Sequence, residues 1–265
     1  MAKPYYDFFL RVFGLPLLLL MGIGPLIAWR RASVRSLLKT LRWPIGVSII
    51  AGAALIAAGA GSSRPGLIAY TFAAFVLTTI AVELVRGTRA TGSLFQLIGR
   101  NRRCYGGYVV HFAIVMLAIG IAGSSAYATV REQKLKVGQS MTVAGHTVTY
   151  QRLERSNTSV AHEVRAVLSL SGREHGTIRT GVNNFFTGDT SKEVGIHTDW
   201  LRLEDTYVIF DQQEGNAVFF KVLVKPLVNL IWLAGLVFLA GSAVALWPDA
   251  REQRRLVARL ALAKA

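Results

Sequence analysis

One stretch, from Tyr105 to Tyr127, constrains this chain more than any other. It contains no Lys, Arg, Asp or Glu. A run of this length without charge can cross the roughly 30 Å hydrocarbon core of a bilayer as an α-helix. Because lipid offers no hydrogen bonds to the backbone, the run predicts a membrane-spanning helix.

Four further apolar stretches predict four more spans, in a chain whose mean hydropathy is +0.40. The first stretch contains Gly14, Pro16 and Pro25, which predict an irregular helix supported by its neighbours. The expected spans are residues 8–29, 43–61, 67–85, 106–127 and 225–248.

The net charge of +15 is unevenly distributed. Residues 128–225 carry 12 Lys and Arg against 11 Asp and Glu, whereas the rest of the chain carries 18 against 4. The excess therefore flanks the apolar runs, which argues for membrane orientation and against nucleic-acid binding. We expect the basic segments 30–42, 86–103 and 249–265 to be cytoplasmic, with the N-terminus outside. The last segment is expected to form a short amphipathic helix on the inner leaflet.

Residues 128–224 have a different pattern, in which apolar and polar residues alternate. The alternation is clearest in residues 141–153, 162–172, 194–203, 205–212 and 217–224. Such runs separated by Gly, Asn and Asp predict an antiparallel β-domain, with turns at 143–146 and 180–189. The expected fold is a polytopic α-helical membrane protein of five spans, with this β-domain inserted on the outer, periplasmic side.

A single cysteine, Cys104, excludes an intrachain disulfide, and the chain has no CxxC or CxxCH motif. The protein is therefore neither a c-type cytochrome nor a thiol-disulfide enzyme. We interpret Cys104 as a bystander at the membrane boundary.

His111 is the one histidine in an apolar run. A titratable group at this depth is costly and usually faces the protein interior or a cofactor. Two interpretations remain open from the residues alone, a haem iron ligand and a buried, hydrogen-bonded histidine. Under the first, Gly106 and Gly107 would let a flat macrocycle approach the helix.

Four other side chains also have two interpretations. Arg102 and Arg103 either anchor the helix at the cytoplasmic face or pair with a haem propionate. Glu83 either pairs with Arg86 at i,i+3 or serves as a proton- or haem-associated group. His197 is either a surface histidine of the β-domain or lies near a delivered haem.

Three segments in order resemble one family, the CcmF/NrfE haem lyases of cytochrome c maturation. The central segment carries Asn101-Arg102-Arg103, Tyr105-Gly106-Gly107-Tyr108, His111 and Gly120 through Ser125. The flanking segments are 17–29 and 222–241. The likeness covers nearly the whole chain and is to the C-terminal half of CcmF.

This resemblance implies that His111 is one of two axial ligands of a transmembrane haem b. It also implies an inner-membrane location and a role in joining haem to apocytochrome c. The second haem-b histidine and the tryptophan-rich WWD segment lie in the family's N-terminal half, and neither is found here. Either the gene is split, as in the plant-mitochondrial arrangement, or this is a fragment. The chain is therefore expected to be inactive alone.

The implied partners are an N-terminal CcmF half, the haem chaperone CcmE, apocytochrome c with its delivery subunit CcmH, membrane lipid and quinol. Two alternatives remain. One is a non-catalytic membrane scaffold for cytochrome assembly. The other is an NrfE-type lyase that serves a nitrite reductase.

Overall fold

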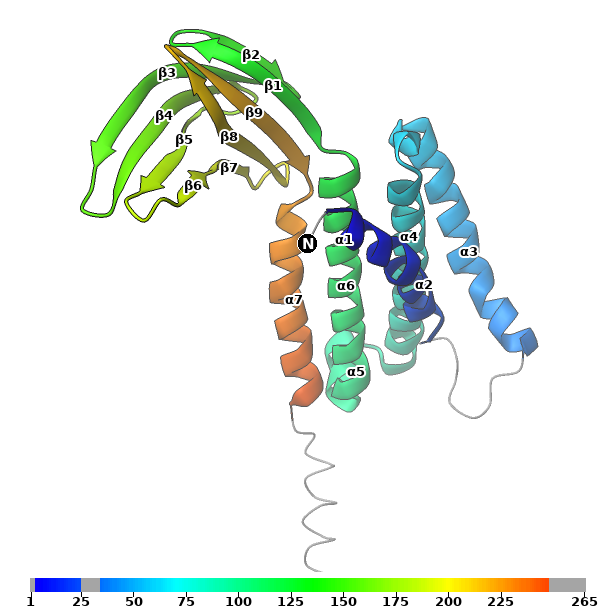
Figure 1. Cartoon of the computed structure of the whole chain (residues 1–265). Helices are drawn as coiled ribbons and strands as arrows, with labels where there is room; N and C mark the ends of the chain where they lie inside the picture. Colours follow the sequence, from blue (N-terminus) through cyan, green and yellow to red (C-terminus); the bar gives the residue numbers. More distant parts are fainter. Residues whose placement is uncertain (1–2, 25–33, 248–265) are drawn as a thin grey trace, which may run out of the picture. The chain divides into compact units, whose positions relative to one another are not determined.

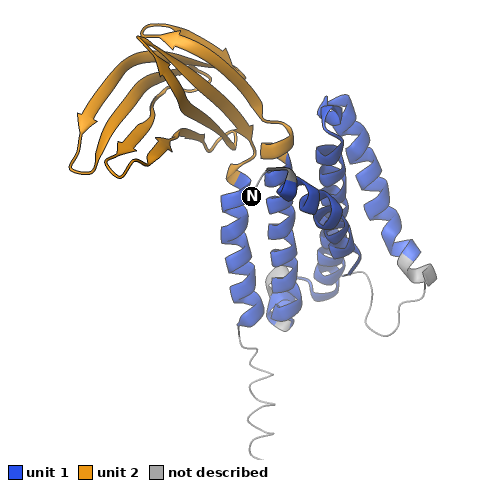
Figure 2. Ribbon diagram, in the orientation of Figure 1, with its two compact units in different colours: residues 1–122, 230–265 blue, residues 123–229 orange. Residues whose placement is uncertain are grey.

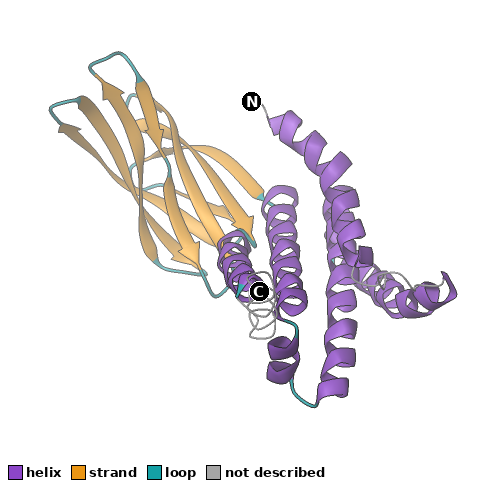
Figure 3. Ribbon diagram, turned by 90° about the horizontal axis from the view of Figure 1, so that it is seen from below, coloured by secondary structure: helices purple, strands orange, loops and turns teal. Residues whose placement is uncertain are grey.

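The structure is a computed structural model that describes residues 3–24 and 34–247. It divides into two compact units (Figure 2). One contains residues up to Ala122 together with those from Leu230, and the other is Gly123–Asn229. The first unit is helical, whereas the second contains all the described strands (Figure 3).

The helices follow the apolar runs of the sequence (Figure 1). They are α1 Lys3–Phe9, the π-helix η1 Leu10–Gly14, α2 Leu15–Ile23, α3 Val34–Ala57, the 3₁₀-helix η3 Ala60–Ser62, α4 Arg64–Thr91, α5 Leu94–Arg100, α6 Arg102–Ala126 and α7 Asn229–Leu246. Within the described residues, five stretches are long and apolar enough to cross a membrane: Tyr5–Ile23, Leu38–Ala57, Arg64–Thr91, Arg102–Ala126 and Asn229–Leu246. The predicted class of a five-span membrane protein is confirmed.

The first span is irregular, as predicted. Leu10–Gly14 is π-helical between two α-helices. Pro16, two residues after the π-helix, has no N–H to donate to the carbonyl of residue 12, which favours a wider local turn. The expected end of this span at residue 29, like the tail 249–265, lies outside the described residues.

Two basic segments between predicted spans, 30–42 and 86–103, are largely helical where the structure describes them. In the segment 30–42, the chain is helical from Val34, and α3 contains Pro44 in its interior. In the segment 86–103, α4 continues to Thr91 and ends at Gly92, whose φ of 77° is left-handed. Basic residues are good helix formers, so a positive charge excess does not end a helix. A left-handed glycine does end one.

The core of the helical unit is centred on α4. Leu18 of α2 packs with Ala73, Phe75, Val76 and Ile80 of α4. Four residues of α6 lie against or within the same cluster: Tyr108, Val115, Ala118 and Ile119. One face of α6 is therefore directed at α4.

The β unit is two antiparallel sheets (Figure 1). The strands are β1 Thr129–Lys136, β2 Ser140–Val143, β3 His146–Asn157, β4 Ala161–Gly172, β5 Gly176–Phe185, β6 Thr190–Glu193, β7 Gly195–Asp199, β8 Glu204–Glu214 and β9 Ala217–Pro226. One sheet has the order β1-β9-β8-β7 and the other β2-β3-β4-β5-β6. The predicted antiparallel β-domain is confirmed.

A single apolar cluster fills the space between the sheets. Tyr150 of β3 and Phe220 of β9 meet edge to face, with ring centroids 5.1 Å apart. Side chains from both sheets complete this cluster, as the alternation of the strands requires.

The two predicted turns have different outcomes. Residues 143–146 do turn, with positive φ at Ala144 and Gly145. The prediction for 180–189 is wrong for its first half, because β5 continues to Phe185. Gly181 lies in the strand, where an added Cβ would clash with the carbonyl oxygen of Val164. This glycine serves a close approach between strands and does not mark a turn.

The passage from the β unit into α7 also differs from the prediction. The fifth span was predicted to begin at residue 225, but Pro226 ends β9 opposite Glu204. Leu227 has a φ of 61°, so the chain turns there and the helix begins at Asn229. Proline without a donor is suited to a strand end as well as to a helix start.

Candidate functional site

The start of α6 is fixed by a side-chain cap. Asn101 precedes the helix, and its Oδ1 accepts a hydrogen bond from the backbone N–H of Cys104 at 3.3 Å. An asparagine in this position satisfies one of the orphan donors at a helix N-terminus. The cap sets where the helix begins and hence the rotational position of every residue after it.

His111 lies seven residues, about two turns, after Cys104 and is partly buried. Its Nδ1 lies 2.7 Å from the carbonyl oxygen of Gly107. A carbonyl can only accept, so Nδ1 carries the proton and the lone pair of the neutral ring is on Nε2. This tautomer is the one that a metal-binding histidine needs when it coordinates through Nε2.

The face of α6 that carries His111 is also the face directed at α4. His111 follows Tyr108 by three residues and precedes Val115 by four, and both belong to the core around α4. Residues three and four apart share one side of a helix. His111 therefore lies on this side of α6.

The two glycines before His111 have different surroundings. A Cβ on Gly106 would lie 2.5 Å from the backbone nitrogen of Ala245 in α7. Gly241 of α7 similarly approaches the backbone of Val110, at 2.9 Å. The prediction that Gly106 makes room for a macrocycle is therefore wrong, because α7 occupies that space. A Cβ on Gly107 would meet nothing within 4 Å, so an open surface adjoins the histidine there.

The helical period separates the two arginines. An α-helix turns about 100° per residue, so Arg103, eight residues before His111, lies about 80° around the helix from it. Arg102, nine residues before, lies about 180° away, on the opposite side. Both are about 12–14 Å from His111 along the axis. Arg103 is the better placed of the two to act on the same side as the imidazole.

Glu83 forms the pair that the sequence predicted. Arg86 Nη1 lies 2.8 Å from Glu83 Oε1, at i,i+3 on α4. The carboxylate has an ordinary ion-pair partner, so the structure offers no reason to assign it a chemical role.

The other four histidines lie in the β unit, in separate surroundings. His146 is buried and contacts Glu204 at 2.9 Å, whereas His197 contacts Glu174 at 2.6 Å. His162 lies beside Asn157, and His175 is exposed. Among the described residues, no group of three or more His, Cys, Asp and Glu side chains is arranged to hold a metal ion.

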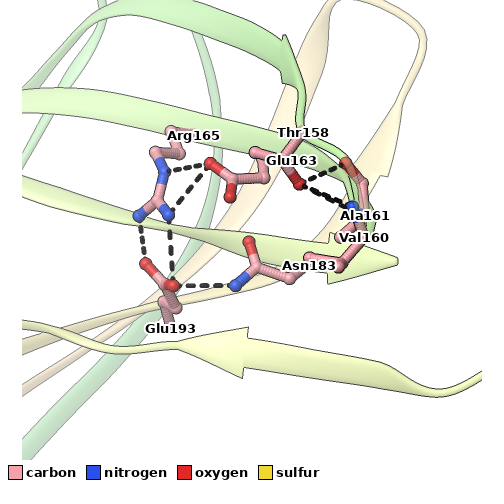
Figure 4. A network of polar contacts seen from close by, with 7 residues as sticks. All are labelled: Thr158, Val160, Ala161, Glu163, Arg165, Asn183 and Glu193. Atoms are coloured by element: carbon pink, nitrogen blue, oxygen red, sulfur yellow. Dashed lines mark hydrogen bonds and ion pairs between the residues drawn. The ribbon is translucent and has the colours of Figure 1, made fainter. Parts of the chain in front are cut away.

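A polar network on β4, β5 and β6 was not foreseen from the sequence (Figure 4). Arg165 contacts both Glu163 and Glu193, and Asn183 donates to Glu193 at 2.7 Å. The pKa of Glu193 is lowered, most strongly by the hydrogen bonds from Arg165 and less strongly by the hydrogen bond from Asn183. The hydrogen bonding between Arg165 and Glu193 also raises the pKa of Arg165. The network joins β6 to β4 and β5 through side chains.

Comparison with known proteins is informative over nearly the whole chain, although no family model matches it. A cytochrome c-type biogenesis protein CcmF from Pseudomonas fluorescens is 29% identical over 253 residues, covering 92% of this chain. The CcmF of Escherichia coli is 21% identical and covers 96%. A solved structure described as cytochrome c heme lyase CcmF superimposes with a TM-score of 0.74 at 25% identity, covering 93% of the chain.

The chain resembles the C-terminal half of CcmF. The two CcmF relatives are much longer, since this chain spans 37% and 39% of their lengths and 41% of the solved one. A probable NrfE of Escherichia coli matches over 52% of this chain, at 23% identity. The resemblance to CcmF thus extends through both units, whereas this match to NrfE covers about half of the chain.

Proposed function

We propose that this chain is the C-terminal part or subunit of a CcmF-type cytochrome c haem lyase. In this role it supplies one axial ligand, His111, to a haem b within the membrane. A CcmF relative matches 92% of this chain, whereas the probable NrfE matches 52% of it. This difference favours a CcmF-type over an NrfE-type lyase.

The observation that carries the proposal is the hydrogen bond between His111 Nδ1 and the Gly107 carbonyl, at 2.7 Å. It leaves the Nε2 lone pair for a ligand and holds the ring against its own helix. The open surface at Gly107 adds space beside that ring. These residues therefore fit a haem, which when bound would supply a one-electron redox centre.

One histidine gives one axial ligand. The other four histidines of this chain lie on or between strands of the β unit, outside its apolar runs. We infer that the second ligand comes from a segment equivalent to the remaining part of the longer CcmF relatives. The lyase would then be active as the complex of both parts and inactive with this chain alone.

Arg103 is our candidate for a haem propionate partner, since it lies nearer to the His111 side of α6 than Arg102 does. Arg102, about 180° around the helix from His111, is the second candidate. The alternative role of either arginine is to anchor the helix at the cytoplasmic face.

The other parts of the proposal follow from the charge distribution and the family. The chain would lie in the inner membrane with its N-terminus outside, its C-terminus in the cytoplasm and its β unit in the periplasm. Its partners would be the N-terminal CcmF part, CcmE, apocytochrome c with CcmH, and quinol.

The test is the reduced-minus-oxidised spectrum of the chain purified with its partner subunit. His111→Gly should lose the haem b signal, and added imidazole should restore part of it, because the small ring can occupy the vacated position. Phe112→Ala, an exposed neighbour on the same helix, is the matched control and should keep the signal. Full haem b in the folded His111→Gly complex would overturn the proposal. If the unaltered complex contains no haem b, the chain is a scaffold.

A further inference from the structure

The turn between β7 and β8 exposes two large apolar side chains. Leu201 is 97% exposed and the neighbouring Trp200 is 61% exposed. The β unit therefore leaves almost the whole Leu201 side chain uncovered. Exposed apolar groups of this kind commonly mark a contact with a protein or a membrane.

The turn is held in one conformation by Asp199, which is buried. Its Oδ1 accepts hydrogen bonds from the backbone N–H groups of Leu201 and Arg202, each at 2.9 Å. Leu203 completes the turn with a φ of 57°. The apolar pair is therefore presented on a preorganised loop, and little conformational entropy is lost when it binds.

The same aspartate ties the turn to the start of a membrane span. The side-chain N–H of Asn229 donates to the backbone carbonyl of Asp199 at 3.2 Å, and Asn229 is 1% exposed. Asn229 is the first residue of α7, whose 18 residues are apolar enough to cross a bilayer. A single hydrogen bond therefore links the start of the turn, at Asp199, to the first residue of the span, Asn229.

Basic side chains accompany the apolar pair. Arg202 belongs to the turn, and Lys225 lies near the end of β9, where it pairs in register with Asp205. The Lys225 ammonium lies 4.8 Å from the centre of the Tyr207 ring. Tryptophan and tyrosine with nearby Lys and Arg form the usual composition of a membrane interface, where the cations meet lipid phosphates.

We propose that Trp200 and Leu201 insert into the headgroup boundary of the leaflet that α7 enters, with Arg202 and Lys225 against lipid phosphates. The occupant is phospholipid and not a partner protein, because the turn is fixed at the first residue of a span. This interfacial anchor would limit the tilt of the β unit. The inference rests on the membrane-spanning fold and is independent of haem binding.

The experiment uses the full chain with Cys104→Ser as background, since Cys104 is the one cysteine of the sequence. An environment-sensitive fluorophore is attached at Leu201→Cys or, as the matched control, at Val137→Cys. Val137 is 57% exposed on the β1–β2 turn. That turn is at the other end of the strands, about 30 Å from Leu201 at 3.3 Å per residue.

Each labelled protein is placed in nanodiscs of phosphatidylcholine and phosphatidylglycerol, with and without bromine on the upper acyl chains. Insertion of about 5–10 Å should reduce the Leu201 emission about twofold in brominated lipid, with no change at Val137. Aqueous iodide should quench the fluorophore at Val137 more strongly than the fluorophore at Leu201.

Two results would overturn the inference. One is equal behaviour of the two positions, which would place the turn in water. The other is protection of Leu201 from iodide without any effect of bromine, which would indicate a protein contact. Thermal unfolding of each labelled protein, matched to the unlabelled chain, checks that the label leaves the fold intact.

Discussion

His111 and Gly107 are joined by a hydrogen bond within one helix, between Nδ1 and the carbonyl oxygen, at 2.7 Å. Gly107 has no side chain, and a Cβ added there would meet nothing within 4 Å, so the surface beside the imidazole is open. One residue thus orients the imidazole and also leaves space next to it. Its neighbour Gly106 instead allows α6 to pack closely against α7.

The two glycines should therefore respond differently to the same substitution. Gly107→Ala should leave stability unchanged or raise it by about 0.5–1 kcal/mol, because alanine is the better helix former. It should lower haem content if the macrocycle lies beside it. Gly106→Ala should instead destabilise the helical unit, because its Cβ would lie 2.5 Å from Ala245. Thermal unfolding and haem absorbance of the purified complex measure both effects. Equal behaviour of the two variants would contradict this division of roles.

The arginines at the start of α6 form a second matched pair. Arg103→Leu should weaken haem retention more than Arg102→Leu, since Arg102 lies on the opposite side of the helix from His111. A charge-assisted contact is typically worth about 1.5–3 kcal/mol, so haem affinity should fall about tenfold or more for Arg103→Leu. Competition for haem with an apoprotein acceptor gives the two affinities. A larger loss for Arg102→Leu would reverse the assignment.

The buried pair of His146 and Glu204 predicts a stability difference in the β unit. Glu204→Ala leaves a buried imidazole N–H without its acceptor and should cost about 1–3 kcal/mol. Glu204→Gln keeps an acceptor oxygen at the same position and should cost clearly less. Urea unfolding followed by circular dichroism in the strand region compares the two. An equal loss would show that packing, and not the hydrogen bond, is what Glu204 provides.

Glu193 predicts a pH dependence with a definite sign. Its pKa is lowered in the folded state by hydrogen bonds from Arg165 and Asn183, from an ordinary value of 4.5. A lowered pKa contributes stability above the unfolded value, and this contribution is lost as the pH falls through the folded value. Glu193→Gln should therefore be less stable than the unaltered chain at neutral pH, and the gap should close in acid.

The size of this effect is limited by exposure, since the Glu193 side chain is 40% exposed. Solvent screening reduces such a pair to about 1 kcal/mol or less. Urea midpoints at neutral pH and at about pH 3 measure the change. Glu154→Gln is the matched control, because this β3 carboxylate is as exposed as that of Glu193 and also contacts an arginine, Arg152. A gap that widened in acid would contradict the sign.

The sequence by itself determined the membrane-spanning helices and the alternating strands, because these depend on local pattern and on the surrounding solvent or lipid. Tyr105–Tyr127 had to be a helix, because an uncharged run of that length in lipid must satisfy its own backbone. The alternation in strands such as β4 and β9 required two faces, one of them buried. The resemblance to CcmF likewise needed only three segments in order.

Tertiary structure decided what these residues face. Strand β1 escaped prediction because it is mostly exposed and lacks alternation, and its place is set by pairing with β9. Gly181 resembles a turn residue and serves the approach of β4. Gly106 and Gly107 are identical in sequence terms, yet one packs on α7 and the other is open. Such differences are caused by residues distant along the chain, so the local pattern of the sequence cannot predict them.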